Sequence, residues 1–176
     1  MTKNPRDRAV INSLAQLDKN SYQIHSRWME YALELAQTAA NLGEVPVGAV
    51  IVDRQGNLLA QAANRKIRKQ DPTAHAEILA IRTATKAIAN CYLSNCTLYV
   101  TLEPCPMCAG AIVHSRLGLL VYGADDPKTG AIRSVINLPD SYCSNHRLQV
   151  LAGIKEQSCR QQLQTWFSDR QNRTKA

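Results

Sequence analysis

The sequence is poor in aromatic residues and has no apolar run long enough to cross a membrane. Aromatic side chains make up 5% of the 176 residues, so a core must be built mainly from aliphatic and alanine side chains. No apolar stretch approaches the roughly 20 residues that span a bilayer. The first part of the chain mixes both charge signs and lacks the apolar segment of a secretory signal. These absences argue against a membrane partner, and we expect the protein in the cytoplasm.

Glycine and proline are also scarce, with 8 and 7 residues, which excludes a collagen-like repeat. Hydrophobic residues make up 45% of the chain, enough for the core of one domain of this length. Lysine and arginine number 21 against 14 acidic residues, and the net charge of +7 favours an anionic partner. In a reducing compartment, the six cysteines are thiols, metal ligands or catalytic groups rather than a disulfide framework.

Helical and strand-like apolar patterns alternate along the chain. Helical spacing predicts helices over residues 26–42, 105–115 and 154–167, and another helix opens at Asp71-Pro72-Thr73. Short apolar or β-branched runs predict strands over residues 47–52, 58–63, 97–102, 117–122 and 148–151. This alternation predicts a layered α/β domain. We expect a flexible polar leader over residues 1–21, a catalytic domain over 22–168 and a basic tail over 169–176.

Two short segments carry side chains suited to metal chemistry: HAE at residues 75–77 and PCPMC at residues 104–108. One imidazole and two thiolates are donors that zinc prefers. Cys105 and Cys108 are three residues apart at a predicted helix start, so they lie on one side of its first turn. Together with His75 they would leave a tetrahedral ion one open position, where a water can ionise near neutral pH. Glu77, a carboxylate that is not a ligand, is then the candidate for proton transfer.

Other interpretations of these residues remain open. A C-x-x-C pair is also found in redox dithiols, although these do not need a His-x-Glu segment upstream. A closed structural zinc site would require a fourth ligand, as in a zinc-stabilised RNA-binding module without catalysis. His114 is a poor fourth ligand, because six residues after Cys108 place it about 240° around the same helix.

The motifs resemble those of a known family. HAE followed by PCPMC matches the H-x-E…P-C-x-x-C pattern of the zinc-dependent nucleobase deaminases. Further runs resemble, more specifically, the bacterial tRNA-specific adenosine deaminases, over about residues 26–167. These runs are EVPVGAV at 44–50, DPTAHAE at 71–77, TLEPCPMCAGA at 101–111, HSR at 114–116, YGA at 122–124, KTG at 128–130 and NHR at 145–147.

The resemblance implies a fold, a cofactor and a reaction. The fold would be a three-layer α/β/α sandwich with a five-stranded mixed sheet, as in the cytidine deaminases. His75, Cys105 and Cys108 would bind one Zn²⁺ ion per subunit, and Glu77 would be the catalytic proton shuttle. The reaction would be hydrolytic deamination of adenosine to inosine at the wobble position (34) of a tRNA anticodon, that of an arginine tRNA.

The resemblance also implies contacts with a tRNA anticodon stem-loop and a homodimer whose tRNA site draws on both subunits. Asn64 would contact the flipped base, and Lys128 and Thr129, with Asp126 just before them, would line the nucleotide entrance. The remaining implied substrate contacts are Asn145, His146 and Arg147.

Positive charge is concentrated in one predicted loop, residues 64–72, between Asn64 and His75. We expect it at the rim of the pocket, where it would bind anticodon phosphates with an affinity that falls steeply with salt. The alternative function is a deaminase of a free base or nucleoside, of guanine or cytosine type, with the same zinc site. A free base would not require this excess of positive charge. Two features depart from the family: the leader has no counterpart, and the basic run after Trp166 is thin.

Overall fold

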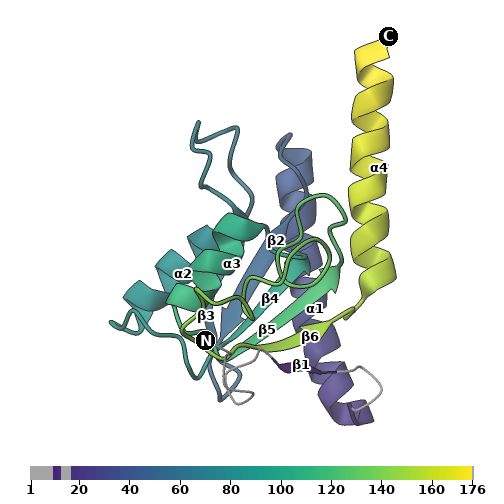
Figure 1. Cartoon of the computed structure of the whole chain (residues 1–176). Coiled ribbons are helices and arrows are strands. Elements are labelled where there is room, and N and C mark those ends of the chain that lie inside the picture. Colours follow the sequence, from purple (N-terminus) through teal and green to yellow (C-terminus); the bar gives the residue numbers. More distant parts are fainter. Residues whose placement is uncertain (1–9, 13–16, 176) are drawn as a thin grey trace.

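The structure, a computed structural model, describes residues 10–12 and 17–175 of the chain. Within this part, one mixed sheet is flanked by helices on both faces (Figure 1). No helix there combines the length and apolar character of a membrane span. The strands are β1 (Val10–Asn12), β2 (Gly48–Val52), β3 (Leu58–Ala63), β4 (Thr97–Leu102), β5 (Leu119–Ala124) and β6 (Gln149–Ala152). The helices are α1 (Lys19–Asn41), α2 (Ala76–Ala87), α3 (Pro106–His114) and α4 (Glu156–Lys175).

The strand order is β1-β6-β5-β4-β2-β3. Strands β1, β6, β5 and β4 run parallel, and β2 is antiparallel to both β4 and β3. All five predicted strands are present, with ends shifted by at most two residues. The sheet has one strand more than the five that the resemblance implied, because β1 pairs with the edge of β6. Only a short tripeptide of the polar leader forms this strand, so no alternating pattern marked it in the sequence.

Two hydrophobic layers hold the helices to the sheet. Alternate residues of a strand point to opposite faces, and β2 shows this directly. Ala49 and Ile51 pack with α2 and α3, whereas Val50 and Val52 pack with α1. The chain therefore folds as the expected three-layer α/β/α sandwich, with α2 and α3 on one face and α1 and α4 on the other (Figure 1).

Helix α1 begins at Lys19, seven residues before the predicted start. Asp18 is its N-cap, and the Asp18 carboxylate accepts a hydrogen bond from the Ser21 N–H at 2.9 Å. The apolar spacing revealed only the buried part of this helix, because its first two turns are largely exposed. The expected boundary at residue 22 therefore falls inside α1. Residues 1–9 and 13–16 of the expected leader lie outside the described part of the chain.

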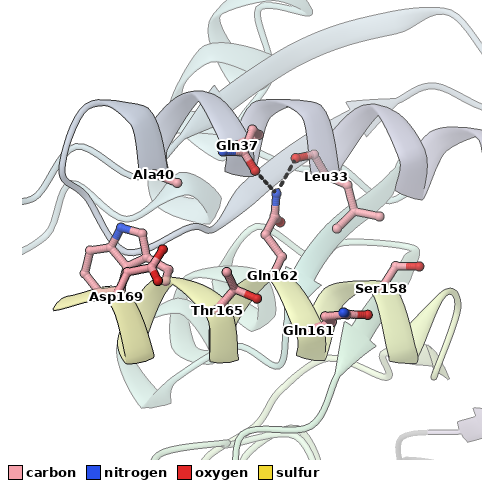
Figure 2. A pocket seen from close by; sticks show the side chains of 9 residues that line it. Leu33, Gln37, Ala40, Ser158, Gln161, Gln162, Thr165 and Asp169 are labelled. Carbon is pink, nitrogen blue, oxygen red and sulfur yellow. Dashed lines mark hydrogen bonds between the residues drawn. The ribbon is translucent and has the colours of Figure 1, made fainter. Parts of the chain in front are cut away.

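Helix α4 extends to Lys175, so all of the expected basic tail except residue 176 is helical. A polar groove of about 470 Å³ separates α4 from α1 (Figure 2). The Gln162 amide bridges this groove, because its Nε2 donates to the Leu33 carbonyl at 3.2 Å and to Gln37 Oε1 at 3.1 Å (Figure 2). Further along, Arg170 donates to the Gly43 carbonyl at 3.0 Å. Beyond the predicted end at residue 167, a polar contact such as that of Arg170 holds α4, which explains why apolar spacing did not predict this part.

The topology brings several loops to one edge of the sheet. The parallel strands β4 and β5 end there. Strand β3 ends there too, because β2 is antiparallel to both β3 and β4, so that β3 runs in the same direction as β4. Residues that follow these three strands are therefore neighbours, although they are far apart in the sequence. This edge is the usual place for a ligand site in an open α/β sheet.

We predict that the substitution Gly48→Ala destabilises the fold. A Cβ atom at this position would lie 2.0 Å from the Ala32 carbonyl oxygen and 2.7 Å from the Ala36 nitrogen, both backbone atoms of α1. Because the helix must move away from the sheet, the free energy of unfolding should fall by about 3 kcal/mol. Urea denaturation measures this change. In Gly110→Ala, the control, the added Cβ meets no heavy atom within 4 Å, so stability should not fall. Equal stabilities of Gly48→Ala and wild type would contradict the packing described.

Candidate active site

His75, Cys105 and Cys108, the metal-donor cluster, meet where α2 and α3 begin. Their ligand atoms all lie within 4.8 Å of one another. His75 Nδ1 lies 3.7 Å from the Cys105 sulfur and 3.6 Å from the Cys108 sulfur. His75 and Cys105 are the N-cap residues of α2 and α3, and both have an extended backbone. Two helix starts thus aim three metal-ligating side chains at one point.

The extended backbone of His75 also explains how His75 and Glu77 face one site. Two residues of a regular helix at this spacing would point about 200° apart. Helical geometry begins only at Ala76, so the rotation between the two side chains is not that of a regular helix. Glu77 lies on the first turn of α2 with 4% of its surface exposed. Burial raises the pKa of its carboxyl group, and the positive charge of His75 opposes this effect. A carboxyl with a raised pKa is suited to exchanging protons.

The three donors of the metal-donor cluster lie close enough to change one another's pKa values. A hydrogen bond from Cys108, supported by His75, lowers the pKa of the Cys105 thiol to about 4. The pKa of Cys108 is raised, first by its contact with Cys105 and then by burial. The contact with Cys105 also raises the pKa of His75, so a bound metal ion would displace protons from Cys108 and His75. One imidazole and two sulfurs, one of them a thiolate, fit a borderline-soft divalent ion such as zinc. Among the described residues, no fourth histidine, cysteine or carboxylate joins this group.

Asn64 follows β3 and lies beside the segment that precedes His75. Its N–H donates to the Val47 carbonyl at 2.9 Å, and only 7% of the residue is exposed. The next residue, Arg65, donates its N–H to the carbonyl of Ala74, which directly precedes His75. The structure thus places Asn64 close to the segment of His75, and its contact with a base stays a prediction.

The basic loop, residues 64–72, joins β3 to the segment before His75 and projects from the body of the molecule (Figure 1). Residues 65–69 are all exposed. Their backbone is held by Glu44, a carboxylate that is 1% exposed and accepts N–H groups of Ile67 at 3.1 Å and Arg68 at 2.8 Å. The cationic side chains are therefore free to face solvent while the loop that carries them is anchored from within.

The entrance loop, residues 125–134, follows β5 at the same edge of the sheet. The Asp126 carboxylate accepts the N–H groups of Lys128 and Thr129 at 2.9 and 3.2 Å, and the Thr129 hydroxyl at 2.6 Å. Asp126 therefore shapes the turn that exposes Lys128 and Thr129. Buried Glu103 holds the other half of this loop through backbone N–H groups.

Glu44 and Glu103 were not among the residues predicted from the sequence. Both are charged residues within otherwise apolar or metal-binding motifs, EVPVGAV and TLEPCPMC. A charged residue is almost never fully buried unless it is paired. A glutamate inside such a motif therefore indicates a buried carboxylate with hydrogen-bond partners.

The NHR segment (Asn145, His146 and Arg147) is not brought to the metal-donor cluster. His146 Nε2 lies 2.6 Å from the Leu117 carbonyl, just before β5 begins, and Arg147 precedes β6. The segment borders a separate cavity of about 660 Å³ that includes Trp28 and Arg54. The length of β4, roughly 17 Å, lies between this end of the sheet and the end near the metal-donor cluster. Within one chain these residues do not line the same pocket as Glu77, and their contact with a substrate stays a prediction.

This fold, with His-x-Glu and Cys-x-x-Cys segments at two helix starts, defines the deaminase class. Residues 23–165 match the model of the family described as MafB19-like deaminase. The tRNA-specific adenosine deaminase of Haemophilus influenzae is 52% identical to the chain over 153 residues, 87% of this chain and 88% of that protein. The chain belongs to the family of tRNA-specific adenosine deaminases, and it is therefore an enzyme.

Two solved structures are also similar. One, from a study of A-to-I editing by tRNA:A34 deaminases at the wobble position, is 42% identical with a TM-score of 0.76. The match covers 78% of this chain and 99% of that one. The other, guanine deaminase from Bacillus subtilis, is also 42% identical but has a TM-score of 0.55. It covers 57% of this chain and 64% of its own.

Proposed function

We propose that this enzyme hydrolyses adenosine to inosine at wobble position 34 of a tRNA anticodon, with an arginine tRNA as its substrate. The observation that carries this proposal is the exposed basic loop, anchored beside the metal-donor cluster. A free base carries no phosphates, and its recognition does not need such a loop. Similarity to named tRNA deaminases over most of the chain supports the same substrate.

Zn²⁺ is the proposed cofactor, one ion held by His75, Cys105 and Cys108. When bound in such a three-donor site, it lowers the pKa of water toward neutrality. Glu77 accepts a proton from the attacking water and delivers it to N1 of the adenine ring as the water oxygen adds to C6. The hydroxyl now on C6 gives up the second proton, which passes through Glu77 to the amino group. The C6–N bond then breaks, ammonia leaves and the C6 carbonyl of inosine forms. Burial supports this role, because a raised pKa lets the Glu77 carboxyl both take up and release protons.

The rest of the site would hold the nucleotide. Asn64 is fixed next to the segment of His75 and would donate to the flipped base through its amide. Lys128 and Thr129 are exposed on the entrance loop and would contact the ribose or phosphate. Asp126 would act by shaping this loop, because its carboxylate is already bonded to the loop backbone.

We further propose a cytoplasmic homodimer. Val135, Ile136 and Tyr142 are exposed apolar residues on the segment between β5 and β6. Tyr142 has 81% of its surface exposed, which is unusual for a large aromatic side chain without a partner surface. A second subunit, or a distant part of the tRNA, would bring the NHR segment into contact with the substrate.

Substrate preference tests the proposal directly. Purified enzyme should convert adenosine to inosine in an anticodon stem-loop, and its KM should rise steeply with salt because phosphate contacts release counterions. The measurement is nucleoside mass analysis after incubation, with free adenosine, guanine and cytidine in parallel reactions. Preferred turnover of a free base or nucleoside would overturn the tRNA substrate and support a guanine- or cytosine-type enzyme.

The substitution Glu77→Gln should abolish turnover while leaving the substrate bound. An amide cannot carry the proton, so kcat should fall by about 10³-fold or more. Metal content and stem-loop affinity should stay at the wild-type level, as measured by elemental analysis and fluorescence anisotropy. Glu34→Gln, an exposed position on α1, is the control for the lost charge and should retain full activity. Wild-type turnover by Glu77→Gln would show that another group carries the proton.

A further inference from the structure

The carboxylate of Glu103 lies at the centre of a set of hydrogen bonds that none of the proposed steps uses. Glu103 stands between the end of β4 and Cys105, and 2% of it is exposed. Its Oε1 accepts the N–H groups of Ile132, Arg133 and Ser134 at 3.0, 2.7 and 3.0 Å. Its Oε2 accepts the Asp126 N–H at 3.0 Å and the Ser134 hydroxyl. Both ends of the entrance loop are therefore bound to one buried carboxylate.

Gly130 leaves room for this carboxylate. A Cβ atom on Gly130 would lie 2.3 Å from Glu103 Oε2 and 2.6 Å from the Asp126 carbonyl oxygen. The glycine is thus needed for space, because any side chain would displace the carboxylate or the loop. Gly130 forms part of the KTG run that carries two of the predicted substrate contacts.

Other contacts tie the same loop to the segment of the metal donors. The Ala131 N–H donates to the Pro104 carbonyl at 2.9 Å, one residue before Cys105. Arg133, near the end of the loop, pairs with Asp125 at its start through two hydrogen bonds of 3.0 Å. Only residues 127–129 and the side chains near the loop's end remain exposed. The loop is therefore a rigid support for its tip, which carries Lys128 and Thr129.

We propose that Glu103 is a positioning residue for substrate binding, and this inference rests on the proposed function. Its carboxylate fixes the tip of the entrance loop relative to Cys105, so that Lys128 and Thr129 are in place before the nucleotide arrives. A loop ordered in advance loses less conformational entropy on binding, and this raises affinity without touching the chemical step. The hydrogen bonds of the Glu103 carboxylate go to the entrance loop and not to the metal donors.

The neutral substitution Glu103→Gln separates this role from a purely structural one. The amide replaces one acceptor oxygen with a donor that faces N–H groups, so the loop should loosen. We expect KM for the stem-loop to rise about tenfold, with kcat and metal content near wild type. Hydrogen exchange should speed up at the amides of 126 and 132–134. Gly130→Ala should reproduce this pattern, and the double variant should be no worse than the single ones, because both act on one contact.

Two controls localise the effect. Glu44→Gln removes an equally buried carboxylate but should speed exchange in the basic loop, at residues 67 and 68. Glu34→Gln on α1 should change neither the hydrogen exchange of the two loops nor KM. Glu103→Asp, which keeps the charge on a shorter side chain, should recover part of the affinity lost in Glu103→Gln.

Several outcomes would overturn the proposal: an unchanged KM in Glu103→Gln, a loss confined to kcat or metal content, or additive effects of Glu103→Gln and Gly130→Ala. If Glu103→Gln does not fold, Gly130→Ala carries the test with the same expected rise in KM, and Glu103→Asp with a smaller rise. KM is measured with the substrate that the wild-type enzyme turns over. Failure of the wild type on the stem-loop thus contradicts the proposed function, whereas failure of the variants to raise KM contradicts the role of Glu103.

Discussion

The site depends on one constraint, the convergence of an imidazole and two sulfurs at the starts of two different helices. Because His75 and Cys105 are N-cap residues, their backbone is extended and their side chains are not committed to a helix face. The core on this side of the sheet holds α2 and α3 together, and Ala76, Ala80 and Ala109 allow close packing. Movement of either helix would separate donors that now lie within 4.8 Å. The fold therefore acts as the frame of the metal-donor cluster.

Around this frame, two buried carboxylates perform the same task. Glu44 holds the basic loop and Glu103 holds the entrance loop, in each case through backbone N–H groups rather than a basic side chain. Such hydrogen bonds to a charged acceptor are stronger than those between neutral groups, and they fix backbone geometry. The cationic side chains remain available to a polyanion as a result. The two loops are thus held in place from within the fold.

Much of this arrangement followed from local sequence signals. β-Branched runs located the strands, and donor chemistry with three-residue spacing identified His75, Cys105 and Cys108. The length of α4 did not follow, because polar contacts such as that of Arg170 with the Gly43 carbonyl leave no apolar pattern. The pairing of β1 with β6 is a long-range contact, and the sequence of a tripeptide is too short to predict it. The resemblance placed the NHR segment with the site, but it lies at the other end of the sheet. Its position depends on the path of the connection between β5 and β6, which no local pattern in the sequence determines.

We propose that His75, Cys105 and Cys108 hold one catalytic metal ion, and no fourth donor joins them among the described residues. Elemental analysis combined with X-ray absorption at the zinc edge tests this most directly on the purified enzyme. We expect one zinc ion per chain with two sulfur donors and one imidazole from the protein, and a fourth position that exchanges with small anions. A third sulfur or a second imidazole on the metal would mean a closed structural site. That result, or a protein that folds and deaminates without zinc, would show that these residues do not form a catalytic metal site.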